Sequence, residues 1–292
     1  MKLGATLGNT NMGTDFGAIR DAVQALEGAG FDTIATNDHV VGGHPDRAGG
    51  EKVHTSETAV HEPIVLLSFI GAVTTRIELV TAILLLPQRQ TTLVAKQAAE
   101  LDLLSGGRLR LGIGVGRNWM EYEALNEDFT NRGRRMEEQI DVLRRYWTQE
   151  LVTFKGQWHD LDRVGLNPMP IQQPIPIWMG SFVGSINENV IKRIGRMADG
   201  WLPQYPPDML APALERVRGY ARDAGRNPDD LGIECVVRAT PDDDPQKWID
   251  LAVAYRDLGA THLRVGTAGV TKPQEHLDLM LRWYETIRPA VS

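Results

Sequence analysis

The fold is decided by residues 77–116, which read IELVTAILLLPQRQTTLVAKQAAELDLLSGGRLRLGIGVG. The first ten residues, 77–86, form an apolar segment with strand character, and a proline ends it. Good helix formers follow over 93–102, and the sequence SGG then ends that helix. A second apolar strand begins almost at once, over 109–116. Two apolar strands joined by a helix through short loops predict a βαβ unit with parallel strands.

The same alternation extends over the whole chain. Strands are predicted over 2–8, 32–36, 77–86, 109–116, 176–179, 199–203, 232–239 and 261–265, with helices between them. About eight strands alternating with about eight helices predict a (β/α)₈ TIM barrel, an α/β fold. A doubly wound open sheet is the alternative, but its glycine signature should follow the first strand, which here ends in Gly8-Asn9-Thr10-Asn11.

Two stretches are longer than ordinary connections between strands and helices. Val41–Val60 is polar and rich in glycine, and Thr153–Pro174 contains three prolines. Loops of this length in a compact domain are usually functional or disordered. We therefore expect a single domain over 1–292, with 41–60 and 153–174 as insertions at the C-terminal face of the barrel.

Composition excludes several classes of function. The 292 residues carry a net charge of −7, which argues against nucleic acid or an anionic membrane as the main partner. No run approaches the roughly twenty apolar residues of a membrane span, and the first residues show no signal-peptide pattern. The single cysteine, Cys235, lies in a predicted strand and is expected to be a buried, inert thiol. These features indicate a cytoplasmic protein of enzyme size.

Four ordered blocks carry a resemblance to a known family. They are Thr75-Arg76-Ile77, then Leu101-Asp102-x-Leu104-Ser105-Gly106-Gly107-Arg108, then Gly112-x-Gly114-x-Gly116 running into Trp119 and Glu121, and finally Arg132-Gly133-x-Arg135. In these blocks the chain resembles the luciferase-like monooxygenase superfamily. It is most similar to the actinobacterial group of coenzyme F420-dependent oxidoreductases.

The resemblance implies hydride transfer between the deazaflavin of coenzyme F420 and a small organic substrate. An FMN-dependent two-component monooxygenase has the same fold and is the alternative, and a cofactor-binding barrel without turnover is a third hypothesis. The resemblance also implies a homodimer formed through the helices that flank strands two to four. Apolar side chains of one such helix are Leu66, Leu67, Phe69 and Ile70.

The sharpest polar pair is Asp38-His39, at the end of the second predicted strand. Active sites of TIM barrels lie at the carboxyl ends of the strands, and a histidine that titrates near neutral pH can move a proton. An ordinary capping histidine is the alternative. The resemblance places the pair against the deazaflavin, so His39 and Asp38 are the predicted catalytic residues.

A second group of residues is predicted to bind the cofactor. The loop Gly180-Ser181-Phe182-Val183-Gly184 precedes a helix, where backbone N–H groups and the helix dipole favour phosphate; a tight turn is the alternative. The resemblance places the cofactor phosphate at this loop, with Ser181 where a second glycine is usual. Gly114 and Gly116 could allow close approach of a ligand, although packing room for a neighbour explains them equally well.

Two further expectations rest on the resemblance alone. Thr81, Ala82 and Ile83 should contact the ring, with a non-proline cis peptide between Ala82 and Ile83. Arg117 stands where sugar-phosphate dehydrogenases of the superfamily carry an acid, and arginine cannot transfer protons at neutral pH. It could instead bind an anionic substrate or the coenzyme's anionic tail. No metal site is expected, because the histidines are not at ligand spacing.

Overall fold

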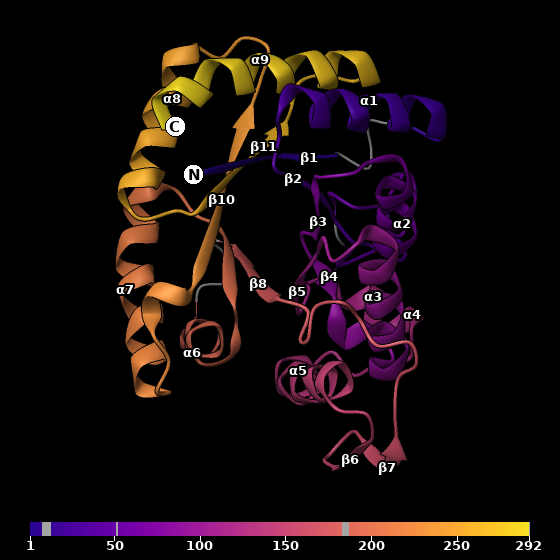
Figure 1. Cartoon of the computed structure of the whole chain (residues 1–292). Helices are drawn as coiled ribbons and strands as arrows, with labels where there is room; N and C mark the ends of the chain where they lie inside the picture. Colours follow the sequence, from indigo (N-terminus) through magenta and orange to yellow (C-terminus); the bar gives the residue numbers. More distant parts are fainter. Residues whose placement is uncertain (8–12, 51, 183–186, 292) are drawn as a thin grey trace.

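The computed structural model describes residues 1–7, 13–50, 52–182 and 187–291. Its parallel strands are β1 (Lys2–Thr6), β2 (Thr33–Thr36), β3 (Glu78–Thr81), β4 (Leu84–Leu85), β5 (Leu109–Gly114), β8 (Ile177–Phe182), β9 (Gly200–Gln204), β10 (Gly232–Ala239) and β11 (His262–Thr267). They pair in the order β3-β2-β1-β11-β10-β9-β8-β5-β4, and an additional β3–β5 pairing closes the sheet. The predicted (β/α)₈ barrel is thereby confirmed (Figure 1).

The third barrel strand is divided into two short segments. β3 pairs with β2 and with the start of β5, whereas β4 pairs with the end of β5. The peptide bond between Ala82 and Ile83, which separates the segments, is cis, as expected. The Thr81 hydroxyl donates a hydrogen bond of 2.7 Å to the Gly112 carbonyl, which ties the end of β3 to β5.

Helices surround the barrel on its outer side (Figure 1). They are α1 (Phe16–Ala29), α2 (Pro63–Val73), α3 (Thr91–Ser105), α4 (Trp119–Ala124), α5 (Arg132–Thr148), α6 (Glu188–Met197), α7 (Pro207–Asp223), α8 (Pro245–Asp257) and α9 (Pro273–Val291). α1 shows how local sequence sets their ends. The Asp15 side chain accepts the N–H groups of Gly17 and Ala18, and Gly30 ends the helix at a φ of 108°.

Charged and aromatic side chains fill the barrel interior at the amino ends of the strands. Glu234 on β10 lies between two arginines, 2.6 Å from Arg110 and 2.7 Å from Arg264. The Arg110 guanidinium packs over the Trp178 ring, with Cζ 4.2 Å from the ring centroid. A Cβ at Gly200 would lie 2.1 Å from the Trp178 ring, so glycine is required there. Because this end is packed, the carboxyl ends of the strands are left for a site.

The first long stretch leaves from the carboxyl end of β2 and folds back on itself. Gly43 and Thr55 form a bridge, and the Ser56 N–H donates to the Gly43 carbonyl at 2.9 Å. A Cβ at Gly42 would lie 2.1 Å from the Thr55 backbone, so this close approach requires glycine. The described residues of 41–60 therefore lie at the C-terminal face of the barrel, where an insertion is expected.

The second long stretch contains a hairpin, β6 (Val152–Lys155) and β7 (Asp160–Val164), beside α5 (Figure 1). Glu138 on α5 anchors its turn by accepting the N–H groups of residues 157–159. The tip reaches the start of α3, where His159 lies 2.6 Å from the Thr91 hydroxyl. The Gln172 side chain, however, donates to the carbonyl of Leu109, the first residue of β5. The stretch 153–174 therefore reaches the start of α3 with its tip and the start of β5 with its later part.

Three of the four residues expected at a dimer interface lie in the core. Leu66, Leu67 and Ile70 are at most 5% exposed, because these faces of α2 pack against the barrel. Phe69 is partly exposed. Cys235 is buried and unpaired, as expected, and burial raises the pKa of its thiol. Among the described helices, none is both long enough and apolar enough to cross a bilayer.

Candidate active site

The centre of the site is His39, which follows β2. Its Nδ1 lies 3.3 Å from both carboxylate oxygens of Glu121, and the same carboxylate accepts the Val40 N–H at 2.9 Å. Glu121 has a fully buried side chain, whereas the His39 side chain is 20% exposed. An ionised carboxylate only accepts hydrogen bonds, so Nδ1 must carry a proton. This leaves Nε2 as the ring nitrogen that can accept or release a second proton.

Glu121 lies on α4, a short helix that was not expected from the sequence. Asn118 begins this helix by accepting the N–H of Met120 at 3.2 Å. In the sequence, Glu121 stands out only as part of the family pattern. Arg117 occupies the position at which sugar-phosphate dehydrogenases of the superfamily carry an acidic residue. The spacing Asn118-x-x-Glu121 is that of a helix start and could have predicted α4. The contact between its glutamate and a histidine 82 positions away could not have been predicted from that spacing.

Asp38 does not act as the partner of His39. Its buried carboxylate accepts the Leu85 N–H at 2.9 Å and pairs with the Arg89 guanidinium at 2.9 Å. Arg89 in turn binds Glu62, the residue that begins α2, at 2.7 Å. Burial raises the pKa of Asp38, and the Arg89 charge opposes that shift. Asp38 and His39 thus belong to two separate pairs, and Asp38 fixes the segment that follows the cis peptide, while a catalytic role for either residue stays a prediction.

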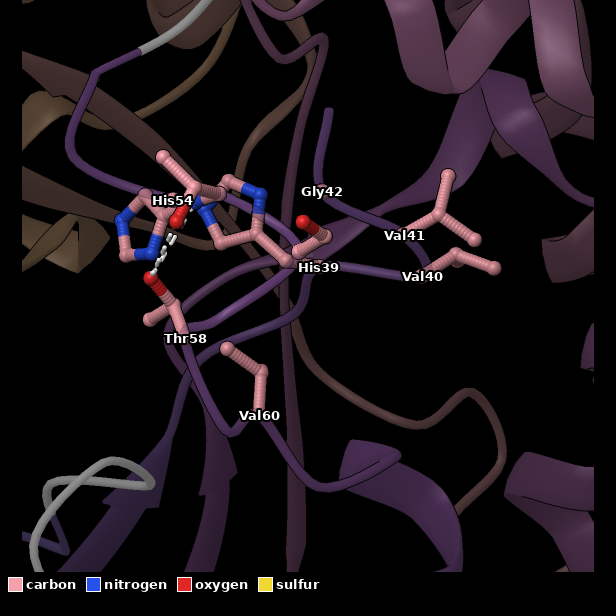
Figure 2. Close-up of a pocket in the computed structure, with 9 residues that line it drawn as sticks. His39, Val40, Val41, Gly42, His54, Thr58 and Val60 are labelled. Carbon is pink, nitrogen blue, oxygen red and sulfur yellow. Dashed lines mark hydrogen bonds between the residues drawn. The ribbon is translucent and has the colours of Figure 1, made fainter. Parts of the chain in front are cut away.

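A cavity of about 320 Å³ opens beside His39, where the stretch 41–60 folds over the end of β2 (Figure 2). It is lined by His39, Val40, Val41, Gly42, His54, Thr55, Ser56, Thr58 and Val60. The His39 and His54 rings are stacked, with centroids 3.8 Å apart and planes inclined by 25°. Aliphatic side chains, hydroxyl groups and two imidazoles line this cavity, whose volume is that of a candidate pocket for a small molecule. His54 was not among the predicted residues.

Gly114 and Gly180 provide packing room inside the barrel. A Cβ at Gly114 would lie 1.9 Å from Cδ1 of Ile83, and one at Gly180 would lie 2.5 Å from its Cγ2. The Ile83 side chain therefore covers both glycines. Gly116 has a φ of 65°, which favours glycine. The packing alternative thus agrees with the surroundings of Gly114, and contact between any of these residues and a cofactor stays a prediction.

The Ser181 hydroxyl takes part in a buried hydrogen-bond network. It accepts hydrogen bonds of 2.8 Å from the Trp201 indole and from the Tyr205 hydroxyl, and all three side chains are buried. Its neighbour Met179 on the same strand face belongs to the hydrophobic core. Strand alternation thus directs the Ser181 side chain into the layer between barrel and helices, and its role at a cofactor phosphate stays a prediction.

Arg117 and Phe182 meet at the rim of the barrel. The Arg117 guanidinium lies 5.3 Å from the Phe182 ring centroid, so the ends of β5 and β8 are joined by a cation–π contact. A cation is thus present near the predicted phosphate loop. Val183 and Gly184, which were expected to bind the cofactor, lie outside the described residues.

Comparison with known families gives one match over nearly the whole chain. The model of the luciferase-like monooxygenase family matches residues 1–287. An uncharacterised protein of Mycobacterium tuberculosis is 32% identical over 220 residues, which cover 73% of this chain and 74% of the relative. A protein of Nakamurella multipartita named F420-dependent glucose-6-phosphate dehydrogenase is 30% identical over 78% of this chain and 65% of its own length. A protein of that name in Kineococcus radiotolerans is 27% identical over 92% of this chain and 79% of its own length.

Solved structures share the fold. An F420-dependent secondary alcohol dehydrogenase, solved with an F420–acetone adduct, superposes with a TM-score of 0.80 at 18% identity over 100% of this chain and 99% of that one. A monooxygenase from Streptomyces bottropensis gives 0.79 at 19% identity, with 100% of both chains covered. An F420-dependent tetrahydromethanopterin reductase from Methanopyrus kandleri gives 0.78 at 16% identity, over 100% of this chain and 99% of that one. At these identities the likeness concerns the fold.

Proposed function

Because the chain belongs to the luciferase-like monooxygenase family, we propose that it is a coenzyme F420-dependent oxidoreductase acting on a small organic substrate. The observation that supports this most is the buried Glu121 carboxylate behind His39, at the carboxyl end of a barrel strand. A carboxylate in this place makes the histidine a proton donor and acceptor. The two relatives named as F420-dependent dehydrogenases, at 30% and 27% identity, support the choice of coenzyme.

The residues at the mouth of the barrel fit a flat, polar coenzyme. Among the described residues, a Cβ at Gly266 on β11 would meet only the Thr6 hydroxyl, at 3.9 Å, which leaves room beside this glycine for a ligand. Three buried side chains near strand ends carry polar atoms without hydrogen-bond partners among the described residues: the Thr36 hydroxyl, the Gln88 amide and Nδ2 of Asn118. Such atoms need partners, which a heterocycle with carbonyl and N–H groups would supply. Arg117 would then bind the anionic tail.

The bound coenzyme would supply the carbon that accepts or releases a hydride. The chain's own part is to move the proton. When an alcohol is oxidised, Nε2 of His39 accepts the hydroxyl proton as the hydride leaves carbon, and the reverse transfer accompanies reduction of a carbonyl. Glu121 holds the Nδ1 proton and stabilises the positive charge that forms on the ring. The stretch 41–60 limits the access of water to this transfer.

The lining of the His39 cavity favours an uncharged substrate. It contains no lysine or arginine within the described part of the chain. The cations of the same stretch have other partners: Arg47 binds Glu123, and Lys52 binds the Pro45 carbonyl. A phosphate ester would have to be desolvated there without a cation to pair with. We therefore propose alcohols, ketones or enones without phosphate as substrates, rather than glucose 6-phosphate.

The proposal is tested by binding and turnover with purified protein. F420 and FMN are titrated separately by fluorescence quenching, and oxidation of reduced F420 is followed with ketones, enones, imines and nitroaromatics. We expect F420 to bind more tightly than FMN, with turnover that is lost in His39→Asn. Preference for FMN with oxygen-dependent turnover would instead identify a two-component monooxygenase. Binding of F420 without turnover of any compound would identify a barrel that only carries the coenzyme.

We also propose that the enzyme is a cytoplasmic homodimer that associates through the outer face of α2. Val65 on this face is 68% exposed, and Phe69 lies beside Phe16 at a centroid distance of 5.7 Å. Exposed apolar side chains that cluster on one helix indicate an interface. Light scattering should give twice the chain mass for the parent and the single mass for Val65→Glu. A monomeric parent at micromolar concentration would refute the dimer.

A further inference from the structure

We propose that His54 is a positioning residue for His39. In this view the His54 ring fixes the plane in which His39 presents Nε2 to the substrate. The inference rests on the proposed function of His39 and adds to it a residue of the stretch 41–60, which neither the family pattern nor the sequence singled out. Its basis is the stacked geometry of the two rings and the way in which the chain holds His54 in place.

Glu121 alone does not define the orientation of the His39 ring. Its two oxygens are both 3.3 Å from Nδ1, which is long for a charge-assisted hydrogen bond and shared between two acceptors. A contact of this length holds Nδ1 only weakly, so by itself it does not stop the ring from rotating about χ2 and carrying Nδ1 away from the carboxylate. The His54 ring lies against the His39 ring at a centroid distance of 3.8 Å and an inclination of 25°. Contact with one face removes that rotation.

The chain keeps His54 at this place by backbone contacts. Its neighbour Thr55 bridges to Gly43, and the Ser56 N–H donates to the Gly43 carbonyl. The Thr58 hydroxyl accepts the Thr55 N–H at 3.1 Å, and the Thr58 N–H donates to the Thr55 carbonyl at 2.9 Å. His54 is therefore held at the base of the stretch, where it closes on β2 (Figure 2). A ring on a freely moving loop could not define the plane of another.

The test compares three substitutions of one residue. His54→Phe keeps a flat ring, His54→Leu keeps the volume without a flat ring, and His54→Ala removes both. We expect Phe to keep the parent single-turnover rate, and Leu and Ala to lower it about tenfold, because misplacement of a reacting group is costly. KM and the Kd of F420 should stay within about twofold. His44→Ala in the same stretch is the control, since its side chain is 70% exposed.

A second readout requires neither coenzyme nor turnover. Ring-nitrogen NMR of His39 should show one tautomer, protonated at Nδ1, in the parent and in His54→Phe. It should show a mixture in His54→Leu and His54→Ala, because a flipped ring no longer presents Nδ1 to Glu121. One tautomer in all four proteins, or parent rates for the Leu and Ala variants, would overturn the inference. The predicted NMR pattern in a protein that oxidises no substrate would instead support positioning and refute the proposed function.

Discussion

Nδ1 of His39 lies 3.3 Å from the carboxylate of Glu121, across 82 positions of sequence. The carboxylate is fully buried and also accepts the backbone N–H of Val40, so it lies where it can act on the imidazole. An ionised group in such a place requires a partner, and the histidine provides it. The pair thus couples α4 to the end of β2 and makes the short helix part of the site.

Neutralising this carboxylate should slow the chemical step. Glu121→Gln keeps an acceptor for the Val40 N–H but removes the negative charge that stabilises protonated His39. We expect the single-turnover rate to fall by about 10- to 100-fold, while the Kd of F420 changes by less than about threefold. Glu123→Gln is the matched control, because that side chain is 59% exposed and pairs with Arg47 on the surface. Parent rates in Glu121→Gln would show that His39 works without it.

Much of the fold could be predicted because its signals are local. β10 occupies the predicted residues 232–239, and α5 begins at the predicted Arg132. Apolar strands, helix formers and terminating glycines act over a few residues each. α4 and the β6–β7 hairpin were missed, since both are short and are held by contacts to distant parts of the chain. Glu138, which anchors the hairpin turn, lies 19 positions or more from the N–H groups that it accepts.

The site was predictable in its position but less so in its partners. The rule that barrel sites lie at the carboxyl ends of strands led to His39. Asp38 and His39 are adjacent in sequence, but neighbouring residues of an extended chain point in opposite directions. Asp38 therefore meets Arg89, and His39 meets Glu121. The same alternation places the Ser181 hydroxyl against Trp201 and Tyr205.

Substitution of Ser181 should affect stability. Ser181→Ala leaves the Trp201 indole N–H and the Tyr205 hydroxyl buried without their acceptor, at a cost of about 1–3 kcal/mol. Ser181→Asp buries a charge and should cost more. Tyr205→Phe removes one donor and leaves the serine satisfied by Trp201, so its effect should be smaller. Urea unfolding of the three variants gives their losses of unfolding free energy, which should be largest for Ser181→Asp and smallest for Tyr205→Phe. A Ser181→Ala protein as stable as the parent would contradict this prediction.

Ile83 should determine whether the neighbouring glycines can be replaced. Gly114→Ala places a Cβ 1.9 Å from Cδ1 of Ile83 and should lower the free energy of unfolding by about 1–3 kcal/mol. Ile83→Val deletes Cδ1, so the double variant should recover most of this loss. Gly180→Ala instead meets Cγ2, which valine retains, and the same second substitution should not rescue it. Double-mutant cycles from urea unfolding compare the two coupling energies. Equal coupling at both glycines would contradict the observed packing.

The buried charges at the amino ends of the barrel strands should make stability depend on pH through His262. Burial, together with the Arg110 charge, lowers the pKa of His262 to about 3, while Glu234 opposes this and Lys2 and the chain's amino terminus add to it. In the unfolded chain the ordinary value is about 6.5. Between pH 6.5 and about pH 3, His262 therefore binds a proton in the unfolded state but not in the folded state. The contribution of His262 to the free energy of unfolding is therefore fully present above pH 6.5 and is lost as the pH falls toward 3.

Between pH 6.5 and pH 4.5 the parent should therefore lose about 2 kcal/mol more unfolding free energy than His262→Gln. Urea unfolding at both pH values gives the difference, and the carboxylates common to the two proteins cancel in it. Trp178, whose ring centroid lies 5.1 Å from that of His262, provides a fluorescence signal for the transition. His44→Gln, at an exposed position, should keep the parent's pH dependence. If His262→Gln and the parent lose equal stability, the histidine accepts its proton in the folded barrel, and burial beside Arg110 does not exclude a further positive charge.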